Sequence, residues 1–150
     1  MRNQPESFQR PTAVERWFNA IVGALVRMGI GLPSMRVLEV QGRKSGRLYT
    51  LPVDLLSRDG KLYLVAPRGR AEWVRNAEAS GSVVLRRGRS VERYQLRALA
   101  DAEKPPILEA YLDRFRREVQ RFFPVPAGSP ADAFASIASQ YPAFELTRSS

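Results

Sequence analysis

The chain of 150 residues is long enough for one domain with a sizeable core, and its 44% hydrophobic and 26% charged residues are ordinary for a globular protein. Lys and Arg outnumber Asp and Glu by 24 to 15, and the resulting net charge of +9 favours an anionic partner. The sequence contains neither cysteine nor histidine, which excludes disulfides, thiolate nucleophiles, imidazole acid–base catalysis and most zinc sites. A catalytic role would therefore require a reactive group supplied by a cofactor.

The N-terminal part of the chain predicts an arm followed by a helix. Residues 1–11 are polar and interrupted by proline, which indicates a flexible arm before a single domain over residues 12–150. Apolar residues including Trp17, Phe18 and Ile21 then recur at helical spacing. This face is expected to pack on the core; a hydrophobic pocket wall and a membrane-surface contact are the alternatives. No secretory signal and no bilayer-spanning segment is visible, so the expected location is cytoplasmic, with peripheral membrane association left open.

A basic turn connects two expected strands over residues 35–40 and 48–56. The turn reads Gly42-Arg43-Lys44-Ser45-Gly46-Arg47. Glycine takes a positive φ at little cost, so a sharp bend fits here. Cations, a hydroxyl and backbone amides gathered at a bend form a natural anion-binding site. The alternative is a solvated hairpin tip that carries basic side chains.

The remainder of the chain alternates short strands with turns before it becomes helical. Further strands are expected over residues 61–66, 82–86, 90–100 and 143–147, and helices over 71–79, from about 105, and from about 130. Strands that arrive through hairpins and cluster in the middle of the chain indicate an antiparallel sheet. With helices on either side, the pattern predicts an α+β domain with a small sheet or barrel.

A nucleic-acid-binding module is the alternative that the positive charge suggests. Arg86, Arg87 and Arg89 would form a second basic tip. The sequence lacks the aromatic signature of RNA-recognition domains, a helix suited to reading DNA, and zinc ligands. The arginines of residues 114–121 alternate with acidic residues, which is typical of a solvated helix face. Nucleic acid is therefore not expected as a partner.

Three segments at fixed distances carry a family resemblance. They are the basic turn followed by Pro52, the strand end Val65-Ala66-Pro67-Arg68-Gly69, and Glu72-Trp73-Val74-Arg75-Asn76. Over residues 37–146 the chain resembles the deazaflavin-dependent nitroreductase and quinone reductase family of actinobacterial type. This resemblance implies a split-barrel flavin or deazaflavin oxidoreductase. The implied fold is an antiparallel split β-barrel with flanking helices at both ends of the chain.

The resemblance also implies coenzyme F420, a hydride carrier with a phosphate and a polyglutamate tail, as the cofactor. The negative charges of this tail match Arg43, Lys44 and Arg47, and Ser45 adds a hydroxyl donor. The other implied cofactor-binding residues are Gly46, Tyr49, Thr50, Pro52, Val65, Ala66, Pro67, Arg68, Gly69, Trp73 and Asn76. A core indole and a helix-capping amide are the alternative roles of the last two. Because many relatives carry arginine at the position of Tyr49, FMN stays open as the alternative cofactor.

The implied reaction is hydride transfer from reduced F420 to a hydrophobic electron acceptor such as a quinone or a nitroaromatic. The protein would position both partners and exclude water. The expected acceptor pocket is apolar, with walls from Trp17, Phe18, Ile21, Tyr111 and Tyr141. A non-catalytic F420- or FMN-binding carrier is the alternative. No metal is expected; the catalytic proton donor, the natural acceptor and the choice between monomer and homodimer stay open.

Overall fold

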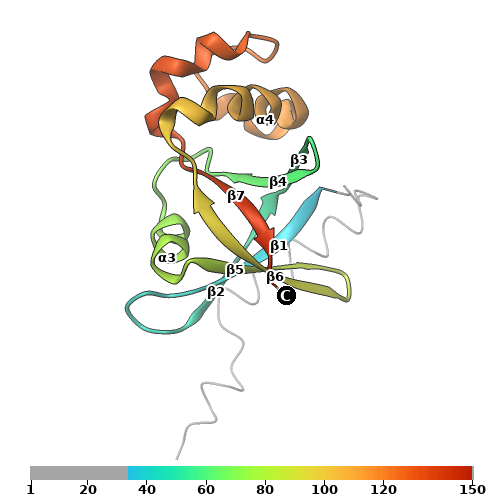
Figure 1. Ribbon diagram of the computed structural model, residues 1–150, viewed down its shortest axis with the longest axis vertical. Coiled ribbons are helices and arrows are strands. Elements are labelled where there is room, and N and C mark those ends of the chain that lie inside the picture. The colour runs from blue at the N-terminus through green and yellow to red at the C-terminus, as the bar shows by residue number, and fades with distance from the viewer. Residues whose placement is uncertain (1–33, 150) are drawn as a thin grey trace, which may run out of the picture.

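Seven strands form one curled antiparallel sheet, and helices pack on it from two sides (Figure 1). The computed structural model describes residues 34–149. The expected arm and the helix that would carry Trp17, Phe18 and Ile21 lie outside these described residues. Between residues 34 and 149, every helix is too short or too polar to cross a membrane.

The strands are short and the helices fall into two groups along the chain. The strands are β1 (Met35–Gln41), β2 (Leu48–Asp54), β3 (Leu56–Arg58), β4 (Lys61–Val65), β5 (Ser82–Arg87), β6 (Ser90–Ala98) and β7 (Ala143–Arg148). Helix α3 (Glu72–Ser80) joins β4 to β5. Between β6 and β7 lie α4 (Lys104–Val119) and the 3-10 segments η1 (Asp101–Glu103), η2 (Gln120–Phe122) and η3 (Ala131–Gln140).

The order of the strands explains why the sheet closes on itself. The order is β2-β1-β5-β6-β7-β4-β3, with antiparallel pairing between all neighbours. Strands β2 and β3 lie at opposite edges, yet only Leu55 separates them in sequence. The sheet must therefore curl until its two edges meet at this residue, whose N–H donates to the carbonyl oxygen of Ser34 at 2.8 Å.

This seam confirms the predicted α+β class and the antiparallel split barrel. It also corrects one detail, because the single strand expected over residues 48–56 is broken at Leu55 into β2 and β3. The flanking helical layer after β6 is present as expected. The expected N-terminal helix belongs to the part of the chain that is not described.

Strand β4 separates two hydrophobic cores, which is why both of its faces are apolar. Leu62 and Leu64 face the interior of the curled sheet, where they join Leu38 and other buried residues of β1, β5 and β7. Tyr63 and Val65 face the opposite way, toward the helical layer. The sheet therefore has one core inside its curl and a second core beneath α4 and η3.

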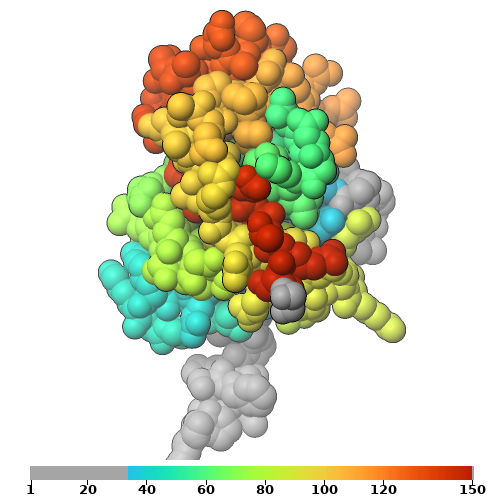
Figure 2. All heavy atoms as spheres, viewed as in Figure 1, coloured from blue at the N-terminus to red at the C-terminus, as the bar shows by residue number. Residues whose placement is uncertain are grey.

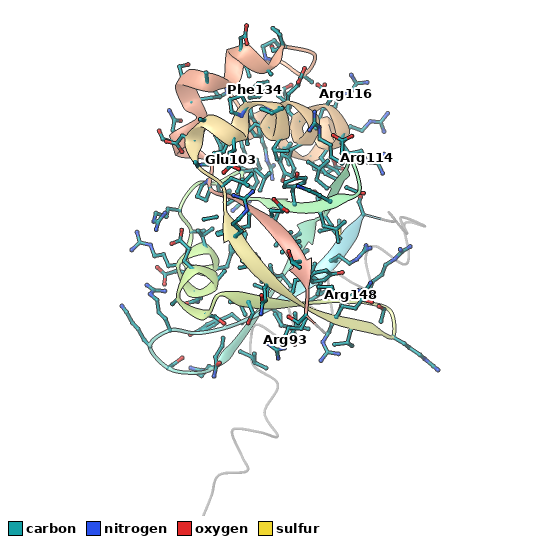
Figure 3. All side chains as sticks on the ribbon, in the orientation of Figure 1. Arg93, Glu103, Arg114, Arg116, Phe134 and Arg148 are labelled. Atoms are coloured by element: carbon teal, nitrogen blue, oxygen red, sulfur yellow. The ribbon has the colours of Figure 1, made fainter. Side chains whose placement is uncertain are left out.

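The helical layer stands as a separate block over the strands in the space-filling view (Figure 2). The apolar residues of α4, among them Ile107, Tyr111 and Phe115, are buried in this second core. Segment η3 runs as a 3-10 helix, rather than the α-helix that its sequence predicts, and buries Phe134. Arg114 and Arg116 project from the outer side of the layer (Figure 3). The layer thus presents its aromatic side chains inward and its charges to water.

Candidate functional site

The basic turn between β1 and β2 is closed by its own backbone. The Gly42 N–H donates to the Arg47 carbonyl oxygen at 2.7 Å, and the Gly46 N–H donates back to the Gly42 carbonyl oxygen at 3.0 Å. Gly46 has a φ of 76°, which explains the glycine. The Ser45 hydroxyl accepts the Arg47 N–H at 3.2 Å. Ser45 is therefore partly occupied in shaping the turn.

Helix α3 holds this turn through Asn76, which is only 4% exposed. The Asn76 side-chain oxygen accepts both the Arg43 backbone N–H at 3.1 Å and the Arg43 guanidinium at 2.7 Å. The same guanidinium pairs with Glu72 at 3.1 Å, and its hydrogen bond and charge lower the pKa of the Glu72 carboxyl. Arg43 and Asn76 are thus committed to fixing the turn against α3.

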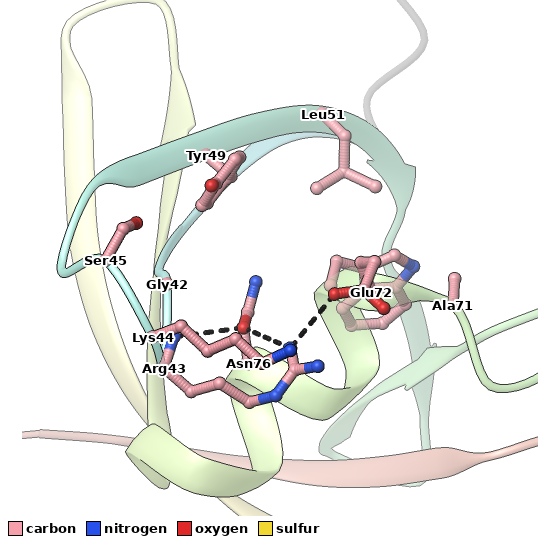
Figure 4. Close-up of a pocket in the computed structure, with 10 residues that line it drawn as sticks. Gly42, Arg43, Lys44, Ser45, Tyr49, Leu51, Ala71, Glu72 and Asn76 are labelled. Atoms are coloured by element: carbon pink, nitrogen blue, oxygen red, sulfur yellow. Dashed lines mark hydrogen bonds and ion pairs between the residues drawn. The ribbon is translucent and has the colours of Figure 1, made fainter.

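A first cavity of about 420 Å³ opens between the turn, β2 and the start of α3 (Figure 4). It is lined by Gly42, Arg43, Lys44, Ser45, Tyr49, Leu51, Ala71, Glu72, Trp73 and Asn76. Lys44 and Arg47 form no ion pair with any residue between 34 and 149. The N-terminal end of α3 adds the partial positive charge of its first N–H groups. This end of the site is suited to an anionic group.

A second cavity of about 500 Å³ lies at the seam, between β2, the β4–α3 turn and α4. Its lining residues are Met35, Leu51, Pro52, Val53, Asp54, Val65, Pro67, Arg68, Ala71, Trp73, Tyr111, Glu118, Val119 and Arg121. Leu51, Ala71 and Trp73 line both cavities. The two hollows are therefore neighbours with a common wall, one basic and the other mostly apolar.

A half-buried carboxyl, Asp54, and a buried phenol, Tyr111, give the second cavity its electrostatic character. Burial, followed by the negative charge of Glu118, raises the pKa of Asp54 to about 6. Burial and then the charges of Asp54 and Glu118 also raise the pKa of the Tyr111 phenol. The Asp54 Oδ1 atom is buried and has no hydrogen-bond partner in the described part of the chain.

The structure brings most of the predicted cofactor residues to these two cavities. Arg43, Lys44, Ser45, Tyr49, Trp73 and Asn76 line the first, and Pro52, Val65, Pro67, Arg68 and Trp73 line the second. Gly46 and Arg47 belong to the turn but line neither cavity. Thr50, Ala66 and Gly69 also line neither cavity; the Thr50 Oγ1 atom is buried and unpartnered among residues 34–149.

The two predicted acceptor-pocket tyrosines lie in different places. Tyr111 lines the second cavity. Tyr141 stacks on Phe123 with 4.4 Å between ring centroids, and its hydroxyl donates to the Phe122 carbonyl oxygen at 2.5 Å. Tyr141 therefore packs in the core of the helical layer and is not brought to either cavity. Trp17, Phe18 and Ile21 lie outside the described residues.

Several lining residues were not predicted from the sequence. In the first cavity they are Gly42, Ala71 and Glu72, and in the second Met35, Val53, Asp54, Ala71, Glu118, Val119 and Arg121. Asp54 carried a usable signal, because it is an acidic residue at the end of an otherwise apolar strand. Glu118 and Arg121 carried none, because they look like the solvated face of a helix.

The paired cavities have the size and chemistry of a ligand site. Each lies within the range of about 300–1,000 Å³ that is typical of small-molecule sites. An elongated ligand could place an anionic arm at the basic turn and a flat apolar ring against Trp73. No group of acidic residues in the described part of the chain is arranged to hold a metal ion. The arrangement thus favours binding of an organic cofactor.

Comparisons with known proteins agree with this geometry. An F420-H2 dependent reductase (FDR-A) has a solved structure with a TM-score of 0.51 and 19% identity, covering 76% of this chain and 94% of that chain. A FAD-binding protein from Mesorhizobium loti has a TM-score of 0.52 and 14% identity, with coverage of 78% and 82%. These likenesses show the fold.

The sequence itself settles the family. Among curated proteins no significant match is found. The sequence profile described as F420H(2)-dependent quinone reductase matches residues 9–121, which is most of the chain. The resemblance that the sequence motifs predicted is confirmed, and the chain belongs to the F420H(2)-dependent quinone reductase family.

Proposed function

We propose that this protein is an oxidoreductase that uses reduced coenzyme F420 to reduce a flat hydrophobic acceptor such as a quinone or a nitroaromatic. The observation that carries the proposal is that Lys44 and Arg47 lie on the turn beside two neighbouring cavities. Both cations lack an ion-pair partner among residues 34–149, and the turn that carries them borders the first cavity. A ligand with a long anionic arm could pair with both of these exposed charges.

The residues of the first cavity fit the cofactor. Lys44 and Arg47 would hold its phosphate and carboxylates through charge-assisted hydrogen bonds. Arg43 would act indirectly, because Asn76 and Glu72 already occupy its guanidinium. Trp73 offers a flat apolar surface to the deazaflavin ring. When bound, the reduced coenzyme would supply the hydride that the side chains of this protein cannot supply.

The second cavity fits the acceptor. Pro52, Val119 and the ring of Tyr111 give it apolar walls, and such walls exclude water and bind a flat aromatic acceptor. Leu51, Ala71 and Trp73 line both cavities, so the two cavities are neighbours. Hydride transfer would take place where the two rings come into direct contact, with the reacting atoms about 3–3.5 Å apart. Positioning the two partners in this way is the main contribution that a protein makes to hydride transfer.

The cofactor assignment is tested by titrating F420 and FMN side by side and following fluorescence. We expect F420 to bind more tightly, and replacing both Lys44 and Arg47 with alanine to weaken binding by about 1–3 kcal/mol for each lost charge-assisted contact. The matched control replaces Arg87 and Arg89, on the β5–β6 hairpin, and removes the same charge elsewhere. Equal losses in both double variants would show that only net charge matters.

The reaction is tested with reduced F420 and menadione. We expect oxidation of the coenzyme that depends on both the protein and the acceptor. Tight binding of F420 without turnover of any quinone or nitroaromatic in a panel would identify a carrier instead. Tighter binding of FMN than of F420 would assign the site to a flavin.

A further inference from the structure

The second cavity contains an acidic group that the fold does not use. Asp54 is the last residue of β2 and borders the seam where the sheet closes. Its Oδ1 atom is buried without a hydrogen-bond partner in the described residues. A buried polar atom left unpaired costs free energy, so such atoms usually have a ligand or a chemical role.

The neighbouring charged groups do not neutralise this carboxyl. Arg68, from the β4–α3 turn, and Arg121, from η2, both line the cavity. Both guanidiniums lie over the Phe122 ring, at 5.1 Å from its centroid for Arg68 and 4.8 Å for Arg121. Neither forms an ion pair with Asp54. Helix α4 contributes two titratable groups, Glu118 and Tyr111, together with the apolar Val119.

These surroundings leave Asp54 able to carry a proton near neutral pH. Burial and the nearby charge of Glu118 raise the pKa of its carboxyl to about 6, which places the group where a general acid works best. The buried phenol of Tyr111 has a raised pKa and is a much weaker acid. Glu118 is mainly exposed to solvent. Asp54 is therefore the acid of this cavity that combines burial with a transferable proton.

We propose that Asp54 is the catalytic acid that protonates the acceptor while it is reduced in the second cavity. This role rests on the proposed function. A quinone gains one hydride, and with it both electrons, from the reduced deazaflavin, which is thereby oxidised. The Oδ–H bond of Asp54 breaks as an O–H bond forms on the reduced acceptor. One proton leaves the deazaflavin for solvent in the same turnover, and one returns from solvent to Asp54.

The kinetic test compares wild-type protein with Asp54→Asn, using saturating reduced F420 and menadione between pH 5 and pH 8. We expect the wild-type rate to fall as pH rises above about 6, since the acid form is then lost. The asparagine variant should be roughly 100-fold slower, the lower end of the usual contribution of a general acid, and its rate should lack that fall. Its dissociation constant for F420 should change less than about twofold.

The matched control is Asp59→Asn, which removes a carboxyl that is 82% exposed at the tip of the β3–β4 hairpin. This variant should keep the wild-type rate and pH profile. Because the chain has no histidine, no imidazole titrates within the measured range. A loss of rate in Asp54→Asn with an unchanged pH profile would contradict the proposed acid role.

A second readout needs neither cofactor nor turnover. The side-chain carboxyl carbon of Asp54, assigned by its absence from the Asp54→Asn spectrum, is followed by ¹³C NMR in the cofactor-free protein. We expect a titration midpoint near 6, and a midpoint near the ordinary value of about 4 would overturn the proposal. Wild-type protein that fails to oxidise reduced F420 would refute the proposed function and this role together. Turnover with an unaffected Asp54→Asn variant would refute the role alone.

Discussion

Asn76 and Arg43 show how single residues fix the geometry of the basic turn. The Asn76 oxygen receives two donors from Arg43, one from the backbone and one from the guanidinium. A buried amide with two such bonds ties the turn to α3, although the two segments are far apart in sequence. The backbone of the turn that carries Lys44 and Arg47 is thereby held in place against α3.

Replacing Asn76 with alanine should loosen this turn. We expect the free energy of unfolding to fall by about 1–3 kcal/mol, because two partly buried donors of Arg43 lose their acceptor. F420 binding should weaken as well, although Asn76 need not contact the coenzyme. Chemical denaturation and F420 titration measure the two effects. Glu72→Gln, which removes only the exposed part of the contact, should leave both nearly unchanged; an equal effect would point to the ion pair as the anchor.

Asp54 should make the stability of the protein depend on pH. Its carboxyl holds a proton more tightly in the folded state, where the pKa is about 6, than in the unfolded chain, where it is 3.8. The contribution of Asp54 to stability should therefore fall as pH rises from about 4 to about 6 and level off above. Asp54→Asn should remove about 1–2 kcal/mol of this fall, a value reduced for the partial exposure of the group. Urea unfolding at pH 4 and pH 7.5 measures it, and an equally steep fall in the variant would contradict the assignment.

Individual site residues could be predicted where they belong to a motif. The basic turn and Trp73 stand out in the sequence, and both line cavities in the structure. The position of Asp54 at the end of an apolar strand was visible in the sequence, but its burial was not, because that burial depends on β2 and β3 meeting across the closed sheet. Tyr141 is an aromatic residue with a polar hydroxyl, as pocket residues often are. In the structure its ring stacks on Phe123 and its hydroxyl donates to the Phe122 carbonyl oxygen, both within the helical layer. Burial and long-range partners are properties of the fold and cannot be read from a local pattern.

At the scale of elements, the turn depends on glycine for two different reasons. Gly46 needs its positive φ. Gly42 is needed for space, since a Cβ there would lie 2.7 Å from the Tyr49 ring and 3.1 Å from the Ser45 hydroxyl. The close approach of the two strands at the base of the turn thus shapes one wall of the first cavity.

Gly42→Ala should therefore displace Tyr49 and weaken F420 binding. Gly60→Ala is the matched control, because Gly60 also lies in a hairpin turn but has a φ of 78° and open space around it. The control should cost about 1–2 kcal/mol of stability through backbone strain and leave F420 affinity unchanged. Denaturation and fluorescence titration separate the two effects. Equal F420 affinities in both variants would show that the Tyr49 wall is unimportant.

Most elements followed from sequence patterns, and the departures have physical causes. Hairpin turns and alternating residues predicted the strands to within about two residues. The break at Leu55 comes from closure of the sheet, which no local pattern encodes. Segment η3 has an amphipathic helical sequence, but it adopts 3-10 geometry while burying Phe134 and Ala138. The local sequence does not distinguish this tighter 3-10 winding from an α-helix.

The whole molecule combines a curled sheet that carries the site with a helical layer that closes one side of it. Phe134 belongs to the helical layer and packs against Phe123 with 6.1 Å between ring centroids. It lines neither cavity. Stability and ligand binding should therefore be separable at this position.

Phe134→Ala should lower the free energy of unfolding by about 3–5 kcal/mol, because it leaves a cavity in a closely packed core. The F420 affinity of the protein that remains folded should change less than about twofold. Titration at low temperature, together with a melting curve, tests both statements. A large loss of affinity in fully folded protein would show that the helical layer controls the cofactor site.

Trp73 gives the molecule an intrinsic optical probe. The chain has two tryptophans, and the indole of Trp73 borders both hollows at once. Its emission should respond whichever hollow is filled, and the order in which two ligands arrive can be followed without any label. In Trp73→Phe that signal should vanish, and the smaller ring would thin the wall that the two cavities share.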